Sequence, residues 1–502
     1  MNLSFFIIIP FITTLLILLT PKEKNKAIKW IALIGTSFLL IYSFILVFKY
    51  YSLVNVFDNG SSSTELLFQQ KISWFSSMGI NYFIGVDGIS ILMLLMTSIV
   101  IFTGVLASWN VVNRNKEFFS LLLILVTGVY GVFISFDLFT FFIFYELAVL
   151  PMYLLIGIWG TGKKEYAAMK LTLMLMASSA LILVAFLAIY HESPIKTFDL
   201  TTLIQVKFAT DFQYWIFPTL FIGFGVLGAI YPFHTWSPDG HASAPTAVSM
   251  LHAGVLMKLG GYGVLRIGVY LMPEGAKVWG MFFMLLATIN IIYGSLGAIA
   301  QKDLKYFTAY SSVSHCGFVL FGVASLNLIG FKGAILQMFS HGIMTALFFA
   351  LIGVIYGRTK TRFIPEMSGL SKVMPYIATC FFIGGFASLG LPGLSGFIAE
   401  THIFFGGIFG NPWNNQFYTI TLSCLITASI VVTAVYVLRG ICQVFMGTIN
   451  EKKFTYLKDA TISERISLGF LVLTILLIGI FPIYSINLIE PSLISLINRL
   501  YI

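Results

Sequence analysis

Long apolar runs separated by short polar segments extend along the whole chain. An α-helix needs about 20 apolar residues to cross the hydrocarbon core of a bilayer, and it satisfies its own backbone polar groups there. The pattern therefore predicts an all-α polytopic membrane protein, with residues 1–502 in a single transmembrane bundle. The predicted spans, fourteen in all, cover residues 3–20, 27–50, 84–110, 117–136, 138–159, 166–190, 215–235, 244–272, 278–300, 305–326, 331–357, 375–408, 417–446 and 465–489.

Positive charge in the connecting segments predicts how the bundle is oriented. Segments that follow odd-numbered spans hold 18 Lys and Arg residues, whereas the other segments and the termini hold 7. Because such residues are enriched in cytoplasmic loops, we expect the odd loops in the cytoplasm and both termini outside, on the periplasmic side of a bacterial inner membrane. The first run is followed by Pro21 and Lys22 rather than a small-residue cleavage site, which predicts a retained first helix.

Two of the predicted spans are interrupted by proline and glycine. The seventh runs into Tyr231–Pro238 (YPFHTWSP), and the twelfth contains Gly390–Gly393 (GLPG). Proline removes a backbone donor and glycine permits a break, so both helices are predicted to be broken. Ordinary proline kinks are the alternative interpretation.

The two breaks lie five spans apart, which predicts two five-helix repeats. A repeat with an odd number of helices must be inverted in the membrane, and inverted repeats with broken helices are typical of transporters. The predicted segments are helices 1–3 (1–110), a first repeat of helices 4–8 (117–272), a second repeat of helices 9–13 (278–446) and helix 14 (465–489).

Composition supports the membrane interpretation and excludes other classes. Charged residues make up 10% of the chain, against about 25% in soluble domains. The net charge of +9 lies in short loops between apolar runs, so membrane orientation explains it more simply than nucleic-acid binding. The cysteines (Cys316, Cys380, Cys424 and Cys442) lie in apolar segments without metal-ligand spacing, so we expect neither a disulfide nor a metal site.

Three charged residues lie deep inside predicted spans: Glu146, Lys258 and Glu400. An ionisable group in the hydrocarbon core costs about 2.5–3.5 kcal/mol even on insertion scales, so such groups mark functional sites. Buried acids and bases with shifted pKa values are what a water-assisted proton relay requires. A buried salt bridge between helices is the structural alternative.

Further titratable residues lie in or near the spans. His252 and Lys258 are six positions apart, about 240° around a helix, so a direct hydrogen bond between them is not expected. His315 and His402 could be packing residues, and Lys170 and Lys305 could extend to the interface. The candidates for the relay or for an interface, besides the three central charges, are Lys170, His234, His252, Lys305, His315, His341 and His402.

Four long motifs resemble the antiporter-like membrane subunits of respiratory complex I. The resemblance covers most of the chain, from about the third to the thirteenth span. The M type is favoured by the length of about 500 residues, by Lys258 in an LMKLGGYG context and by Glu400, where related types carry lysine. The motifs are Phe141–Gly160 (FFIFYELAVLPMYLLIGIWG), Tyr231–Gly261 (YPFHTWSPDGHASAPTAVSMLHAGVLMKLGG), Asp303–Gly317 (DLKYFTAYSSVSHCG) and Leu391–Glu400 (LPGLSGFIAE).

This resemblance implies a proton path within a complex that couples electron transfer from NADH to quinone with proton pumping. It places Glu146 at the family's span-5 glutamate, Lys258 at the relay lysine, His341 at the relay histidine and Glu400 toward the outer exit. FMN, iron–sulfur clusters and quinone are expected in partner subunits, with no cofactor in this chain. Other membrane subunits of L and N type are the expected neighbours.

One position departs from the family pattern. The span-7 lysine that normally pairs with Glu146 is replaced by Leu227, while His252 stands where L subunits carry a relay histidine. Either His252 or Lys258 becomes the partner of Glu146 and pumping survives, or the chain has lost its own path and is a structural membrane subunit. The same features also fit a subunit of a multi-subunit cation/proton antiporter or membrane-bound hydrogenase, and they permit a stand-alone solute transporter.

Overall fold

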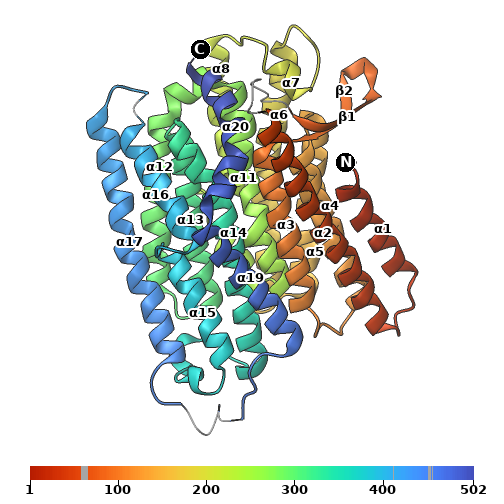
Figure 1. Ribbon diagram of the computed structural model, residues 1–502, viewed down its shortest axis with the longest axis vertical. Coiled ribbons are helices and arrows are strands. Elements are labelled where there is room, and N and C mark those ends of the chain that lie inside the picture. Colours follow the sequence, from red (N-terminus) through yellow and green to blue (C-terminus); the bar gives the residue numbers. More distant parts are fainter. Residues whose placement is uncertain (58–65, 411, 450–453, 455, 502) are drawn as a thin grey trace.

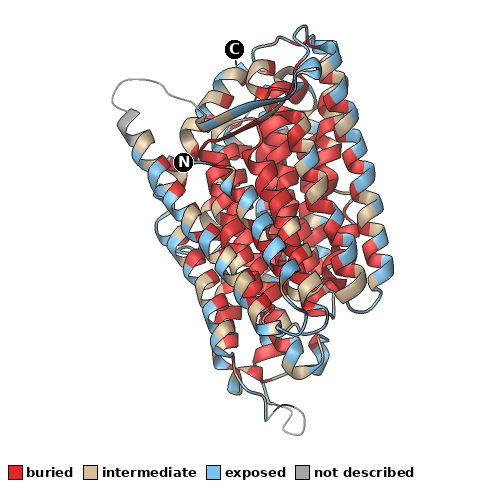
Figure 2. Ribbon diagram, turned by 90° about the vertical axis from the view of Figure 1, so that its right-hand side faces the viewer, coloured by how far each residue is buried: buried red, intermediate tan, exposed pale blue. Residues whose placement is uncertain are grey.

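The computed structural model describes residues 1–57, 66–410, 412–449, 454 and 456–501. Helices run roughly alongside one another in a bundle, with a small β-hairpin and the C-terminus at one end (Figure 1). Buried residues fill the centre of the bundle, and exposed residues lie on the outer helix faces (Figure 2). The predicted all-α polytopic fold is confirmed. Within the described ranges, 11 helices are long and apolar enough to cross a membrane, and Phe5–Leu19 and Pro375–Ser388 are shorter apolar helices.

The described elements follow the predicted order of spans. They are α1 (Phe5–Leu19), α2 (Asn25–Phe57), β1 (Leu67–Phe75), η1 (Ser76–Met78), β2 (Ile80–Val86), α3 (Gly88–Ala107), α4 (Asn115–Ile134), α5 (Leu138–Trp159), α6 (Lys164–Glu192), α7 (Leu200–Leu203), α8 (Thr210–Leu227), α9 (Trp236–Ser243), α10 (Thr246–Leu251), η2 (His252–Leu256), α11 (Met257–Gly263), η3 (Val264–Val269), α12 (Pro273–Ala300), α13 (Leu304–Ala324), α14 (Leu328–Thr359), η4 (Ile364–Glu366), η5 (Leu370–Lys372), α15 (Pro375–Ser388), α16 (Ser395–Phe409), α17 (Gln416–Phe445), α19 (Ile462–Ile480) and α20 (Pro482–Tyr501).

Some element boundaries differ from the prediction. β1 and β2 pair as an antiparallel hairpin, and the predicted third span (84–110) included the end of β2 because that strand is apolar and runs directly into α3. The predicted last span (465–489) is wrong as one helix, because Pro482 begins a new helix, a position that proline favours. The predicted basic positions 452 and 453 lie outside the described residues.

Both predicted helix breaks are present. α8 ends at Leu227 and the next helix, α9, begins at Trp236; α15 ends at Ser388 and α16 begins at Ser395. Gly390 and Gly393 have φ angles of 66° and 87°, in the left-handed region that glycine enters without strain. The breaks therefore follow from the proline and glycine residues that predicted them.

The helix that carries Lys258 also departs from regular α geometry. It runs from α10 through the π-helical segment η2 into α11, and from there through a second π-helical segment, η3. π-segments are rare and are frequent at functional sites. Lys258 thus lies in a short α-helical stretch between two irregular segments.

A glycine lets this helix approach the end of α8. A Cβ atom at Gly260 would lie 2.5 Å from the Gly228 nitrogen and 2.5 Å from the Phe224 carbonyl oxygen, both backbone atoms that cannot rotate away. The contact between α11 and α8 therefore depends on the absence of a side chain at residue 260.

Replacing Gly260 with alanine should destabilise the bundle by about 1–3 kcal/mol or more, as overpacking does, because backbone must move to admit the methyl group. Thermal unfolding in detergent, or the yield of assembled protein, measures the effect. Gly157→Ala is the matched control, since a Cβ at Gly157 meets no atom within 4 Å. Equal stability of the two variants would contradict the packing argument.

Candidate functional site

Lys258 lies at the centre of the bundle and is 1% exposed. Its ammonium group donates a hydrogen bond to the carbonyl of Ala253, within the preceding π-helical segment. A cavity of about 10 Å³ adjoins it, lined among others by Gly228, Cys316 and Met338. That volume is roughly enough for one water molecule. The site holds an amine beside a small cavity with otherwise mostly apolar walls, between the end of α8 and the helices α13 and α14.

A pair of buried histidines lies next to Lys258 along the bundle. The rings of His241 (α9) and His252 (η2) are 4.3 Å apart between centroids, and Trp236 packs on His252 at 5.3 Å. Both ring nitrogens of His252 and the Nδ1 of His241 have no hydrogen-bond partner among the residues that the structure describes. Buried polar atoms of this kind are usually satisfied by ordered water. No hydrogen bond within the described chain joins His252 to Lys258, as the spacing predicted.

A second histidine pair lies on α13 and α14. Met338 of α14 lines the same small cavity as Lys258, three positions before His341, and the His341 ring is 5.1 Å from that of His315 (α13). His341 is fully buried, and within the described part of the chain neither of its ring nitrogens has a hydrogen-bond partner. His315 contacts the Ser388 hydroxyl at 3.0 Å through Nε2 and the Gln337 amide at 3.1 Å through Nδ1. The second pair therefore ends at the break between α15 and α16.

Glu400 lies beside His315, at the end of this series of buried groups. Its Oε1 lies 3.5 Å from His315 Nδ1, and the side chain is buried. A Cβ at Gly390 would lie 2.7 Å from Glu400 Oε2, so the carboxylate packs directly against the broken backbone. The break thus gives a buried carboxylate a place beside a histidine that can exchange a proton with it.

A polar cavity of about 640 Å³ lies near the other end of this series of buried groups. Asp239 and Tyr306 are among its lining residues, together with Arg362 and Lys163. Lys170 pairs with Asp239 at 2.8 Å, and the Tyr306 hydroxyl donates to Asp239 at 3.1 Å. These contacts connect α6, α9 and α13 around this cavity, whose walls carry charged side chains.

Lys305 links this polar cavity to the histidines. It is buried and donates to the Ala244 carbonyl at 2.6 Å. Ser249 donates to the same carbonyl and to that of His241, at 3.2 and 3.0 Å. Lys305 is therefore an interior residue. The interface alternative fits Lys170 better, since its side chain is 24% exposed.

The remaining predicted residues lie outside this series of buried groups. His234 is buried against Tyr293, with ring centroids 4.7 Å apart, and neither of its nitrogens bonds another described residue. His402 is partly exposed and bonds the Ile398 carbonyl of its own helix at 2.8 Å, which fits the packing alternative. Leu227 is fully buried at the end of α8, beside the glycine that lines the Lys258 cavity.

Glu146 faces outward from the bundle. It is partly exposed and lies on the same side of α5 as the exposed residues Ile143 and Leu150. Among the described residues no ion pair or hydrogen bond joins Glu146 to His252 or Lys258. The expected direct pairing of Glu146 with either group is therefore not found within this chain.

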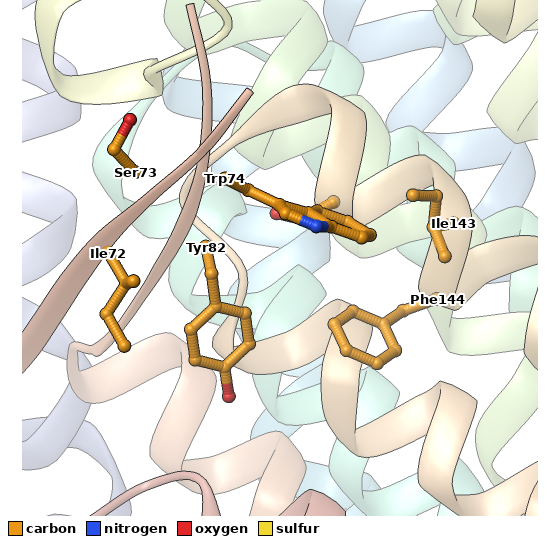
Figure 3. Close-up of a pocket in the computed structure, with 7 residues that line it drawn as sticks. Ile72, Ser73, Trp74, Tyr82, Ile143 and Phe144 are labelled. Atoms are coloured by element: carbon orange, nitrogen blue, oxygen red, sulfur yellow. The ribbon is translucent and has the colours of Figure 1, made fainter. Parts of the chain in front are cut away.

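An apolar cavity of about 470 Å³ lies between the hairpin and α5 (Figure 3). Trp74 and Tyr82 of the hairpin face Ile143 and Phe144 of α5 across it (Figure 3). Because the exposed residue Ile143 lines it, this cavity lies on the outward side of α5, apart from the buried titratable groups.

The structure thus brings together most of the predicted relay residues and adds others. We refer to these buried groups as the line; they are Lys305, the pair His241 and His252, Lys258, the pair His341 and His315, and Glu400 beside His315. His241, Gln337, Ser388 and Asp239 were missed by sequence reasoning. Asp239 could have been found as a polar residue that directly follows Pro238 at a broken helix. Gln337 and Ser388 give no such signal.

Known proteins share the sequence and the fold of this chain. Residues 135–430 match the family model described as NADH:quinone oxidoreductase/Mrp antiporter, TM. NAD(P)H-quinone oxidoreductase chain 4 3 of Picosynechococcus sp. is 39% identical over 88% of this chain and 79% of its own length. Chain 4 of Prochlorococcus marinus is 37% identical over 99% and 92%.

Solved structures agree with the sequence relatives. A chain of respiratory complex I from Thermus thermophilus superposes with a TM-score of 0.88 at 26% identity, covering 99% of both chains. A chain of the Mrp complex from Dietzia sp., at 19% identity and a TM-score of 0.76, shares the fold. This multi-pass membrane protein belongs to the family of membrane subunits common to NADH:quinone oxidoreductases and Mrp antiporters.

Proposed function

We propose that this chain is a proton-translocating membrane-arm subunit of an NADH:quinone oxidoreductase of the complex I type. The observation that carries the proposal is the buried line of titratable side chains from Lys305 to Glu400, which crosses both broken helices. Each side chain on it can accept and release a proton, and the unpaired ring nitrogens leave positions for bridging water. Proton transfer explains these residues better than stability does, because burying each charge costs free energy.

Protons enter this line from the cytoplasm through the cavity lined by Asp239 and Tyr306, and they leave on the outer side beyond Glu400. The cavity lies next to residues 161–163, in a loop that the distribution of positive charge places in the cytoplasm. Both termini then lie outside. The two breaks at matching positions support two inverted repeats, residues 117–272 and 278–446, that each contribute half of the path.

Glu146 connects this path to a neighbouring membrane subunit. A carboxylate on an outward helix face in the middle of a span is too costly to leave against lipid, so a partner of L or N type covers it. Leu227 removes the lysine that would pair with Glu146 inside the chain. His252, beside His241 and Lys258, then supplies the additional base within the path.

Redox chemistry belongs to the partner subunits in this proposal. FMN, the iron–sulfur clusters and the quinone site lie outside this chain, whose residues hold and move protons. Membership of an antiporter or membrane-bound hydrogenase complex is the second candidate, because an Mrp chain shares the fold. Purification of the native complex separates the two, since flavin and iron–sulfur subunits that bind NADH should co-purify only in the first case.

Lys258→Gln should slow proton transfer through the chain by about 10²-fold or more, because it removes the central acid–base group. The proton-to-electron ratio of the complex in liposomes measures the effect. Lys332→Gln is the control, since Lys332 pairs with Glu490 at 2.5 Å away from the relay. An unchanged ratio in Lys258→Gln would show that this subunit is only structural.

His315→Gln should lower proton pumping because glutamine keeps a polar contact with Ser388 but cannot take up the proton that passes to Glu400. His402→Gln removes a histidine two positions after Glu400 that bonds only its own helix among the described contacts. Proton release from NADH-energised vesicles should fall severalfold in the first variant and stay at the wild-type level in the second. Equal rates in both variants would exclude His315 from the path.

A further inference from the structure

A buried ion pair lies at the hairpin end of the bundle, outside the proton path. Asp87 directly follows β2 and caps α3, accepting a hydrogen bond from the Ser90 nitrogen at 3.0 Å. Both of its carboxylate oxygens lie 2.6 Å from Nη2 of Arg266. The side chains are 11% and 8% exposed. Burying these two charges costs free energy, and neither of them lies at the surface of the bundle.

Arg266 and Lys258 are on the same helix. Their separation of eight positions corresponds to roughly 12 Å along the axis. Arg266 lies in η3, toward the hairpin, and packs over the rings of Phe136 and Tyr262 at 5.1 and 5.4 Å. The Tyr262 hydroxyl contacts Ser90 and donates to the Phe133 carbonyl. The ion pair and its aromatic neighbours therefore occupy the space between Lys258 and the hairpin end.

Neither member of this pair can pass a proton onward. A guanidinium group has five donors and no acceptor, and it does not release a proton in proteins. Asp87 already accepts from Arg266 with both oxygens and from Ser90. A water wire that reached the pair would stop there.

We propose that the Asp87–Arg266 pair is a plug that closes the hairpin end of the first half of the bundle, so that a proton on Lys258 can leave only toward His341. The inference rests on the proposed function, because it assigns a direction to the same path. Without the plug, Lys258 would have two exits, and protons could pass through the chain without turnover of the complex.

The test is passive proton leak through the purified complex in liposomes, without NADH, under a potassium diffusion potential, followed with a pH-sensitive dye. The double variant D87N/R266Q removes both charges and leaves groups that donate and accept. It should leak severalfold faster than wild type, and adding Lys258→Gln should abolish the increase. A D87N/R266Q complex that leaks protons no faster than wild type would overturn the proposal.

A second ion pair provides the matched control. Arg358 and Glu464 form a partly buried pair at 2.6 Å, between α14 and α19, away from the relay. R358Q/E464Q should remain tight, and a leak equal to that of D87N/R266Q would show a general packing defect and overturn the proposal. If D87N/R266Q fails to assemble, the variant R266K replaces it in the test. Lysine keeps the positive charge but can release a proton, so the R266K complex should leak faster than wild type. A leak rate equal to that of wild type would contradict the plug.

The outcomes separate this inference from the proposed function. If pumping depends on Lys258 but D87N/R266Q leaks no faster than wild type, only the plug is contradicted and the proposed function stands. Normal pumping by the Lys258→Gln complex would remove the proposed function, whatever the leak.

Discussion

The energetic cost of ionisable groups in a hydrocarbon environment constrains the rest of this structure. A buried amine such as Lys258 persists only where backbone carbonyls, neighbouring polar groups or water compensate it. The π-helical segment before Lys258 supplies a carbonyl, and the break after α15 gives Glu400 a place beside His315. Irregular backbone inside a membrane is tolerated only where protein surrounds it or where it lines a cavity. The breaks and the charges therefore depend on each other.

The same constraint explains the difference between the inner and outer charged residues. Lys258, His341 and Glu400 are enclosed by helices of this chain, whereas Glu146 lies on an outward face. An outward carboxylate indicates that the functional unit extends beyond this chain. The Asp87–Arg266 pair shows the opposite solution, in which two buried charges neutralise each other and no proton can move.

The sequence predicted the bundle, both breaks and most of the relay because each depends on a strong local signal. Apolar run length predicts spans, proline and glycine predict breaks, and an isolated charge in an apolar run predicts a site. The hairpin and α20 were missed because an apolar strand and a proline at a helix start leave the hydropathy almost unchanged. His241, Gln337 and Ser388 could not be assigned roles, since their partners lie on other helices and their positions depend on packing.

The central claim is that one hydrated line joins Lys258 to both histidine pairs. The most direct measurement is a map of the assembled complex at a resolution that shows ordered water. The account predicts water within hydrogen-bond distance of His252, Lys258 and His341, continuous with Glu400 on one side and Lys305 on the other. A dry apolar gap between Lys258 and His341 in every state of the complex would contradict it.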